Sequence, residues 1–213
     1  ATVREQNQET AQAELAYVRS KHPLKTPPAE GRITVGIPCY NHARFLRATV
    51  ESAQKQSRAV DEILILNDAS TDNFDEVAKS LAYDDPRIKL MAFPDNMGCQ
   101  EAKSQMAFRA TGEFFVVLSA DDTLEPMFIE QCMAEFAKNP WLEFVASQTD
   151  FIDGEAKPVT DATANVVLQI PPATNKPRDQ WLAQLYNGNV YFGAGIYRTR
   201  VISDLGGWKK AFK

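Results

Sequence analysis

Two adjacent carboxylates, Asp121 and Asp122, come two residues after the apolar run FFVVL at residues 114–118. Five aromatic, β-branched and leucine side chains in a row predict a strand that is buried on both faces. Carboxylates are costly in such surroundings unless they are paired or hold a metal, so we expect both just past the strand's carboxyl end. Two hard oxygen ligands there suit Mg²⁺ or Mn²⁺. The alternative is a solvated turn before a helix, since Asp-Asp-Thr is also favourable turn and cap chemistry.

Polar residues also follow three other expected strands. These strand ends are PCYN at 38–41, NDAS at 67–70 and, a little further from its strand, NMG at 96–98. Tyr40 suits stacking on a nucleobase, Asp68 suits a hydrogen bond from a base N–H, and Lys103 suits an approach to a diphosphate. Each has a plainer alternative: an exposed rim aromatic, an Asx turn and a solvated helical lysine. Asp72 is best interpreted as a helix cap.

Alternating strand and helix patterns surround these residues. Strands are expected at 33–38, 62–66, 88–92, 114–118 and 144–147, with amphipathic helices between them. This order predicts an α/β fold: a mainly parallel sheet with helices on both faces, whose strand ends meet in one crevice. After residue 150 the pattern weakens into a proline-containing segment at 154–177. A short helix follows around 181–185, then a strand at 194–197 and a helix at 200–205.

The composition narrows the function classes. The chain has 213 residues, is 44% hydrophobic and carries a net charge of -5, which disfavours a protein that binds nucleic acid through its phosphates. Three cysteines without a CxxC pair are typical of a reducing compartment. The sequence has neither a signal-peptide pattern at its polar start nor an apolar run of ~18 residues, so we expect a cytoplasmic protein.

Four segments carry a family resemblance when they are taken in order: ITVGIPCYN, DEILILNDASTD, NMGCQEAKSQMAFRATGEF and VVLSADD. Together they resemble the family 2 glycosyltransferases, which have the Rossmann-like GT-A fold. The resemblance runs from residue 33 to 122 and continues more weakly to 208. It implies inverting transfer of a sugar from a nucleotide diphosphate donor, usually UDP, to a hydroxyl acceptor in polysaccharide or glycan biosynthesis. It also implies a divalent cofactor, Mn²⁺ or Mg²⁺, and a glycan or lipid-linked acceptor, with work at the inner face of the membrane as one option.

The resemblance assigns roles by position. It puts the base pocket at Pro38, Tyr40 and Asn41, a base contact at Asp68, the DxD motif at Ser119, Ala120 and Asp121, and the metal at Asp121 with Asp122 beside it. Lys103 and Ser104 stand where the family usually has Arg and Asn. Two features depart from the family pattern. Ser119 replaces the first aspartate of DxD, and no acidic residue follows the turn Gly206-Gly207-Trp208, so the catalytic base is expected beyond Lys213.

The resemblance also divides the chain. We expect an N-terminal helix and proline-rich linker at 1–31 and a GT-A domain at 32–213. Within that domain, 32–122 would bind the nucleotide and 123–213, expected to be incomplete, would face the acceptor. The N-terminal helix suits attachment to another domain or to a membrane surface, or is a solvated arm. Ser119 and the unassigned base leave an alternative function open, a non-catalytic GT-A-shaped module. A dinucleotide-dependent oxidoreductase is disfavoured because no GxGxxG follows the first strand.

Overall fold

The computed structural model describes residues 31–140, 142–147, 150, 152–155, 157 and 194–208. Within these residues a six-stranded sheet has the order β3-β2-β1-β4-β6-β5. The strands are β1 (Ile33–Cys39), β2 (Glu62–Asn67), β3 (Ile88–Ala92), β4 (Phe114–Val117), β5 (Phe144–Ala146) and β6 (Gly195–Arg198). The first four run parallel to one another, whereas β6 is antiparallel to both β4 and β5.

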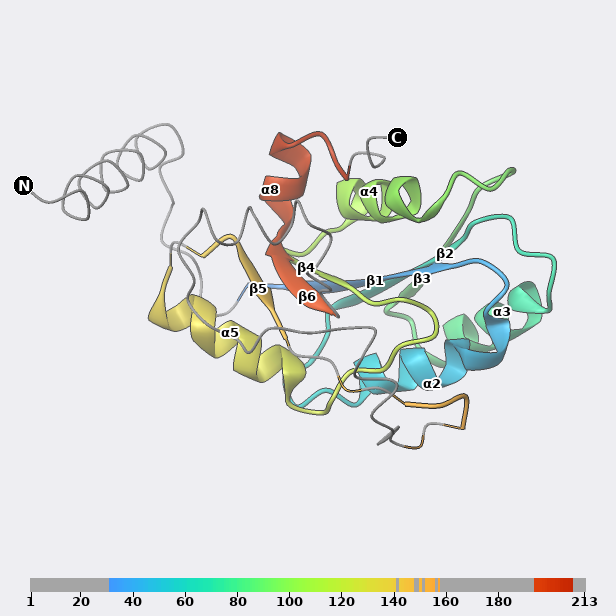
Figure 1. The fold of residues 1–213 in the computed structure, drawn as a ribbon, viewed down its shortest axis with the longest axis horizontal. Coiled ribbons are helices and arrows are strands. Elements are labelled where there is room, and N and C mark those ends of the chain that lie inside the picture. The colour runs from blue at the N-terminus through green and yellow to red at the C-terminus, as the bar shows by residue number, and fades with distance from the viewer. Residues whose placement is uncertain are drawn as a thin grey trace, which may run out of the picture.

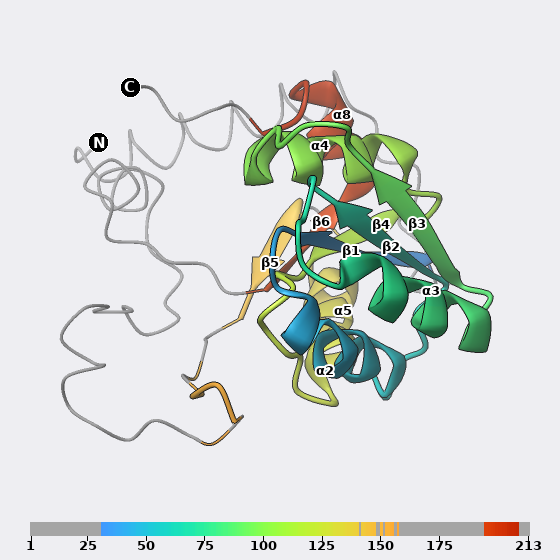
Figure 2. The ribbon, with the colours of Figure 1, turned by 90° about the vertical axis from the view of Figure 1, so that its right-hand side faces the viewer.

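Helices cover both faces of the sheet, as the two views in Figure 1 and Figure 2 show. One face carries α2 (Ala43–Gln54), α3 (Phe74–Asp84) and α5 (Phe128–Lys138). The opposite face carries α4 (Cys99–Arg109) and α8 (Thr199–Asp204). The predicted α/β class, with a mainly parallel sheet between helices, is thereby confirmed. No helix in the described part of the chain is long and apolar enough to cross a membrane.

The buried strands send alternate side chains into two cores, as the period of two in a strand requires. In β2, Ile63 and Ile65 join the larger core under α2, α3 and α5, whereas Leu64 and Leu66 join the smaller core under α4. Phe115 lies in the smaller core across Gly36, where an added Cβ would come within 2.4 Å of its ring. Nearly continuous apolar runs are therefore needed in these strands, and the sequence has them.

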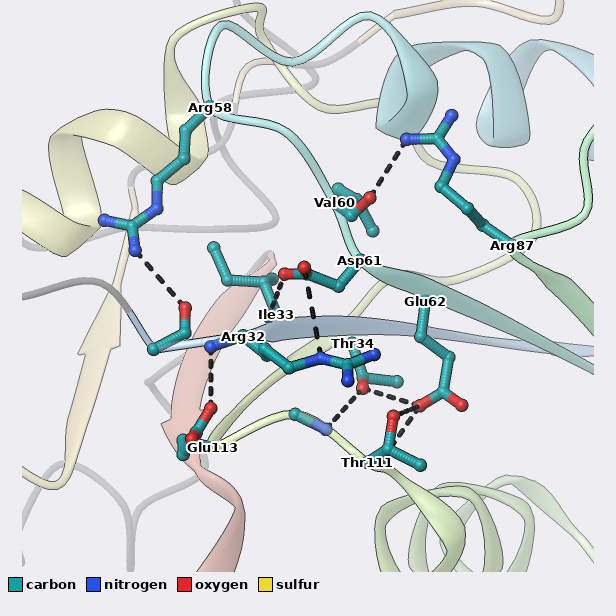
Figure 3. Close-up of polar contacts among 12 residues, drawn as sticks. Arg32, Ile33, Thr34, Arg58, Val60, Asp61, Glu62, Arg87, Thr111 and Glu113 are labelled. Atoms are coloured by element: carbon teal, nitrogen blue, oxygen red, sulfur yellow. Dashed lines mark hydrogen bonds and ion pairs between the residues drawn. The ribbon is translucent and has the colours of Figure 1, made fainter. Parts of the chain in front are cut away.

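The amino ends of the parallel strands are closed by a buried polar network, drawn in Figure 3. Glu62 is 2% exposed, and its carboxylate accepts hydrogen bonds from Thr34 Oγ1 (2.8 Å), Thr111 N–H (2.8 Å) and Lys89 Nζ (2.5 Å). Burial alone would favour the neutral acid, but these donors outweigh it and hold the pKa of Glu62 below its ordinary value. Charge-assisted hydrogen bonds thus fix this end of the sheet, and the candidate site lies at the opposite end.

Several expectations fall on residues outside the described ranges. These are the N-terminal helix and linker through residue 30, the helix around 181–185 and most of the segment 154–177. The last expected strand and helix are present as β6 and α8. β6 lies between β4 and β5, so the strand that follows β4 in the sequence is not its neighbour in the sheet.

Candidate active site

A cleft of about 460 Å³ opens at the carboxyl ends of β1, β2 and β4 and the start of α4. Six of the predicted site residues line it: Pro38, Tyr40, Asp68, Ser119, Ala120 and Asp121. Cys39, Asn96 and Gly98 from the expected strand ends also line it, together with His42, Cys99 and Ala102, which the sequence did not single out as site residues. Asn41, Lys103 and Asp122, which were predicted, are not among the lining residues. The expected convergence of the strand ends on one crevice is therefore present in the fold.

The ends of β1 and β2 are locked together by side chains. The Asn41 side-chain oxygen accepts a hydrogen bond from the Thr71 N–H (2.7 Å), and the Asn41 N–H donates to Ser70 Oγ (3.1 Å). Asn41 and Ala69 both adopt positive φ, 57° and 61°. Such backbone strain is typical of functional sites, where surrounding contacts hold it in place. Asn41 does not line the cleft, but its hydrogen bonds fix the loop that carries Tyr40, which does line it.

Asp68 joins the end of β2 to the start of α4. It is 3% exposed, and its two carboxylate oxygens accept the N–H groups of Met97 (2.7 Å) and Gly98 (2.9 Å). Gly98, with φ of 87°, precedes the first residue of α4. Two carboxylate oxygens offer about four acceptor positions, so Asp68 retains acceptor capacity toward the cleft that it lines. Its position directs the N-terminus of α4, with its partial positive charge, at the cleft.

The predicted metal residues lie in the loop after β4. The Asp121 carboxylate is half exposed, and its Oδ2 lies 3.5 Å from His42 Nδ1. Burial and the neighbouring Asp121 charge raise the pKa of Asp122, while a hydrogen bond from the Ser119 side chain and the Lys103 charge act in the opposite direction. Lys103 therefore lies close enough to influence this pair electrostatically, although it does not line the cleft.

These carboxylates fit a divalent cation. Burial is the main cause of the raised pKa of Asp122 and the neighbouring Asp121 charge adds to it, so a cation held beside the two groups would offset that repulsion. In the part of the chain that the structure describes, no cluster of three or more His, Cys, Asp or Glu side chains has metal-binding geometry. The residues suit an ion of the Mg²⁺ type, which takes one or two carboxylates and completes its shell with water and phosphate oxygens.

Other candidate groups have structural roles. Burial raises the pKa of the Cys39 thiol to about 11, so it is not a thiolate nucleophile at neutral pH. The Ser104 hydroxyl donates to the Gln100 carbonyl (2.8 Å) and accepts the Trp208 N–H (2.8 Å), so it anchors the Gly-Gly-Trp turn on α4. Asp153 closes a turn by accepting the N–H groups of Glu155 and Lys157 (2.9 Å each).

Sequence and structure comparisons were made with this geometry in hand. The chain is 37% identical over 113 residues to the chondroitin synthase of Pasteurella multocida (strain Pm70), an alignment that covers 53% of this chain and 12% of that protein. The mannosyltransferase PcManGT of Pyrobaculum calidifontis, solved with GDP-Man and Mn²⁺, matches with a TM-score of 0.60 and 19% identity over 92% of this chain and 54% of its own. TarS of S. aureus, solved with UDP-GlcNAc, matches with a TM-score of 0.61 and 18% identity over 82% of this chain and 47% of its own.

The two solved structures establish the likeness of fold, that of GT-A enzymes. The chain spans about an eighth of the length of the synthase and about half that of the two solved proteins. The family described as "Glycosyl transferase family 2" matches residues 34–205, which include the sheet, both helical layers and the cleft. The chain therefore belongs to glycosyl transferase family 2.

Proposed function

We propose that this chain is the donor-binding core of a glycosyltransferase that uses a nucleotide diphosphate sugar, of the UDP-sugar type, and a divalent cation. The observation that carries the proposal is the meeting of Tyr40, Asp68 and Asp121 in one cleft beside the N-terminus of α4. The transfer would go with inversion to a hydroxyl of a glycan or lipid-linked acceptor, as part of polysaccharide or glycan synthesis. The names of the relatives support this class, since they include a chondroitin synthase and proteins solved with UDP-GlcNAc or GDP-Man.

The nucleoside would lie across the ends of β1 and β2. Tyr40 is 48% exposed at the rim and offers an aromatic face for stacking on the base, with Pro38 beside it in the lining. The free acceptor positions of Asp68 suit an N–H of the base, such as that of uracil. The half-buried Ser119 hydroxyl suits a ribose hydroxyl, and Ala120 leaves space next to it.

The diphosphate would lie toward the end of β4. Asp121 would hold the cation, with Asp122 beside it, and the cation would supply positive charge to the leaving diphosphate. The helix N-terminus at Gly98 and the ammonium group of Lys103 add positive potential from α4 on the same side. Each of these groups acts on charge that grows as the bond to the sugar breaks, which is where stabilisation accelerates transfer.

The acceptor and the catalytic base belong to the later part of the chain in this proposal, with 32–122 as the nucleotide side and 123–213 as the acceptor side. Among the described acidic residues, Asp153 is occupied in its turn and Asp204 lies 3.9 Å from Arg200. In line with the family resemblance, we assign the base to a part of the protein outside the described residues. Inversion requires that base to deprotonate the acceptor hydroxyl on the sugar face opposite the diphosphate.

Titration calorimetry of UDP into the protein, with and without Mn²⁺, tests the proposal. We expect Mn²⁺ to strengthen UDP binding, and Asp121→Asn to weaken the Mn²⁺-dependent binding by about tenfold or more, or ~1.4 kcal/mol. Asp84→Asn is the matched control, because Asp84 is an exposed carboxylate at the end of α3. UDP affinity that is unaffected by Mn²⁺ and by Asp121→Asn would refute the metal assignment.

The alternative of a non-catalytic module has one observation in its favour, the uncharged Ser119 at the first DxD position. Release of UDP from UDP-sugars, measured with wild type and Asp121→Asn, separates it from an enzyme. An enzyme should release UDP slowly in Mn²⁺ and lose that release in the variant. Tight Mn²⁺-dependent binding with no release, under conditions that include candidate glycan acceptors, would favour the module.

A further inference from the structure

The loop that carries Asp121 and Asp122 has little regular structure of its own. It connects β4, which ends at Val117, to α5, which begins at Phe128. Backbone N–H and C=O groups in such a segment need partners from elsewhere when they are buried. Most of the described partners from outside the loop come from α2 and from the residues just after it, Gln56 and Ser57.

Two residues of α2 and a third just beyond it bind this loop and the start of α5. Thr49 Oγ1 donates to the Ala120 carbonyl at 2.7 Å, and Ser52 Oγ accepts the Leu124 N–H at 3.0 Å. One turn further on, beyond the last helical residue, Gln56 donates to the Glu125 carbonyl (2.8 Å) and accepts the Ile129 N–H (3.1 Å). The spacing of three residues puts Thr49 and Ser52 on the same side of α2, and Gln56 continues the series just past the helix end. The loop is therefore held in register with α2 along most of its length.

We propose that Thr49 is a positioning residue for the divalent cation, acting through the Ala120 carbonyl on the carboxylate of Asp121. Both Thr49 (1% exposed) and Ala120 (2% exposed) are buried, so water does not replace a lost bond between them. Ala120 immediately precedes Asp121, and fixing its carbonyl fixes the peptide plane from which Asp121 extends. This inference rests on the proposed function, because it concerns the same cation.

The position of Asp121 depends on its backbone more than on its side-chain contacts. Its carboxylate is 44% exposed, and among the described residues it pairs with His42, which precedes α2, at 3.5 Å. The Thr49 hydroxyl has a second acceptor in the Phe45 carbonyl at 3.3 Å, within its own helix. The hydroxyl therefore does not need the shorter bond to Ala120 for its own satisfaction, and the main effect of that bond is to hold the loop in place. Outer contacts of this kind typically change metal affinity 10–100-fold when they are removed.

The test compares Thr49→Val, which keeps the shape but loses the donor, with Thr49→Ser, which keeps the donor. Mn²⁺ binding in the presence of UDP is measured by calorimetry and by loss of the free Mn²⁺ EPR signal, and UDP binding without metal is measured separately. We expect Thr49→Val to weaken Mn²⁺ binding about tenfold, with metal-free UDP binding unchanged and Thr49→Ser close to wild type.

Thr34→Val is the matched control. Thr34 is also fully buried, and its hydroxyl donates to Glu62 (2.8 Å) and accepts the Gly112 N–H (3.0 Å) at the opposite end of the sheet. It should lower stability and leave Mn²⁺ affinity unchanged. An equal loss of Mn²⁺ affinity in Thr34→Val and Thr49→Val would overturn the inference, because general loosening of the fold would then explain both.

The remaining outcomes separate this inference from the proposed function. If wild type shows no Mn²⁺-dependent UDP binding, the proposed function fails. If wild type binds and Thr49→Val binds Mn²⁺ equally well, only the positioning role of Thr49 fails. Ser52→Ala extends the test should Thr49→Val not fold, since it removes the Leu124 tether from a half-buried position. A smaller loss of Mn²⁺ affinity is expected there, and unchanged affinity would overturn the role of α2.

Discussion

Ala69 has a backbone conformation that is unfavourable for its residue type. Its φ of 61° is in the left-handed region, where an L-residue other than glycine pays roughly 1–2 kcal/mol. The neighbouring Ser70 N–H bonds the Asn67 side-chain oxygen at 2.7 Å, and the Asp68 N–H bonds the Cys39 carbonyl at 2.9 Å. These bonds hold the turn after β2 in place despite the strain, and they keep Asp68 directed into the cleft.

Replacing Ala69 by glycine should therefore stabilise the fold. We expect Ala69→Gly to raise the free energy of unfolding by about 0.5–1 kcal/mol, because relief of the strain exceeds the added chain entropy of glycine. Urea denaturation measures the change. Ala48→Gly, at an exposed position inside α2, is the control and should lower stability by about 1 kcal/mol. A destabilised Ala69→Gly would contradict the assignment of strain to this residue.

At the scale of elements, Asp72 joins two helices that have no capping side chain of their own. Its Oδ2 accepts the Ala43 N–H at the start of α2 (2.9 Å), and its Oδ1 accepts the Phe74 N–H at the start of α3 (3.2 Å). The residues in the cap positions, His42 and Asn73, make no side-chain cap hydrogen bond. The sequence predicted Asp72 as a cap, which the structure confirms, but the cap extends to a helix that begins 29 residues earlier.

Asp72→Ala should cost about 1–2 kcal/mol of unfolding free energy, since it leaves an N–H at each of two helix starts without its acceptor. Asn73→Ala is the natural comparison, because Asn73 occupies the cap position of α3 without a cap bond, and its cost should lie within about 0.5 kcal/mol. Thermal or urea unfolding of the two variants gives the answer. Equal costs would show that the side-chain bonds of Asp72 do not stabilise these helices.

At the scale of the whole molecule, the two ends of the sheet carry different kinds of charged groups. The amino ends hold satisfied charge networks: Glu62 with its three donors, and Asp85, which accepts Arg87 Nε (2.9 Å) and Nη2 (2.6 Å) and Gln54 Nε2 (2.8 Å). Arg87 in turn donates to the Val60 carbonyl, as Figure 3 shows. The carboxyl ends hold the buried Asp68, the half-exposed Asp121 and the neighbouring Asp122, at or beside the cleft. Under the proposed function, the stabilising networks and the ligand site thus lie at opposite edges of the sheet.

This division predicts how stability depends on pH. The hydrogen bonds from Arg87, outweighing burial, hold the pKa of Asp85 well below its usual range. A carboxylate whose pKa is lower in the folded state than in the unfolded state stabilises the fold. This stabilisation is fully present above the unfolded-state pKa of about 3.9, and it is lost as the pH falls from there toward the folded-state pKa. Asp85→Asn should therefore lower stability at pH 7 and make the decline between about pH 4 and pH 2 shallower. Urea titrations across that range measure it, and Asp84→Asn should leave the slope unchanged.

Much of this fold could be predicted from sequence because β1, β2 and β4 are buried on both faces and have nearly unbroken apolar runs, whereas the edge strand β3 is mostly exposed. The strand ends of the site were predictable for the same reason, since Tyr40, Asp68 and Asp121 lie within a few residues after such runs. His42 and Thr49 were not, because their contacts with Asp121 and Ala120 arise from the adjacency of β1 and β4, and neither residue carries a local signal of it. The direction of β6 depends on a long connection, which no local pattern encodes.

The connection from β5 to β6 begins and ends at residues that lie next to each other. Ser147 follows β5 and Ala194 precedes β6, and the N–H of Ser147 bonds the carbonyl of Ala194 at 3.4 Å. Closing a longer loop between fixed ends costs only about 0.6 kcal/mol for each doubling of its length. We therefore expect changes in the length of the segment between these two residues to cost little free energy. In the proposed function, such changes would leave the strand ends that line the nucleotide cleft in place.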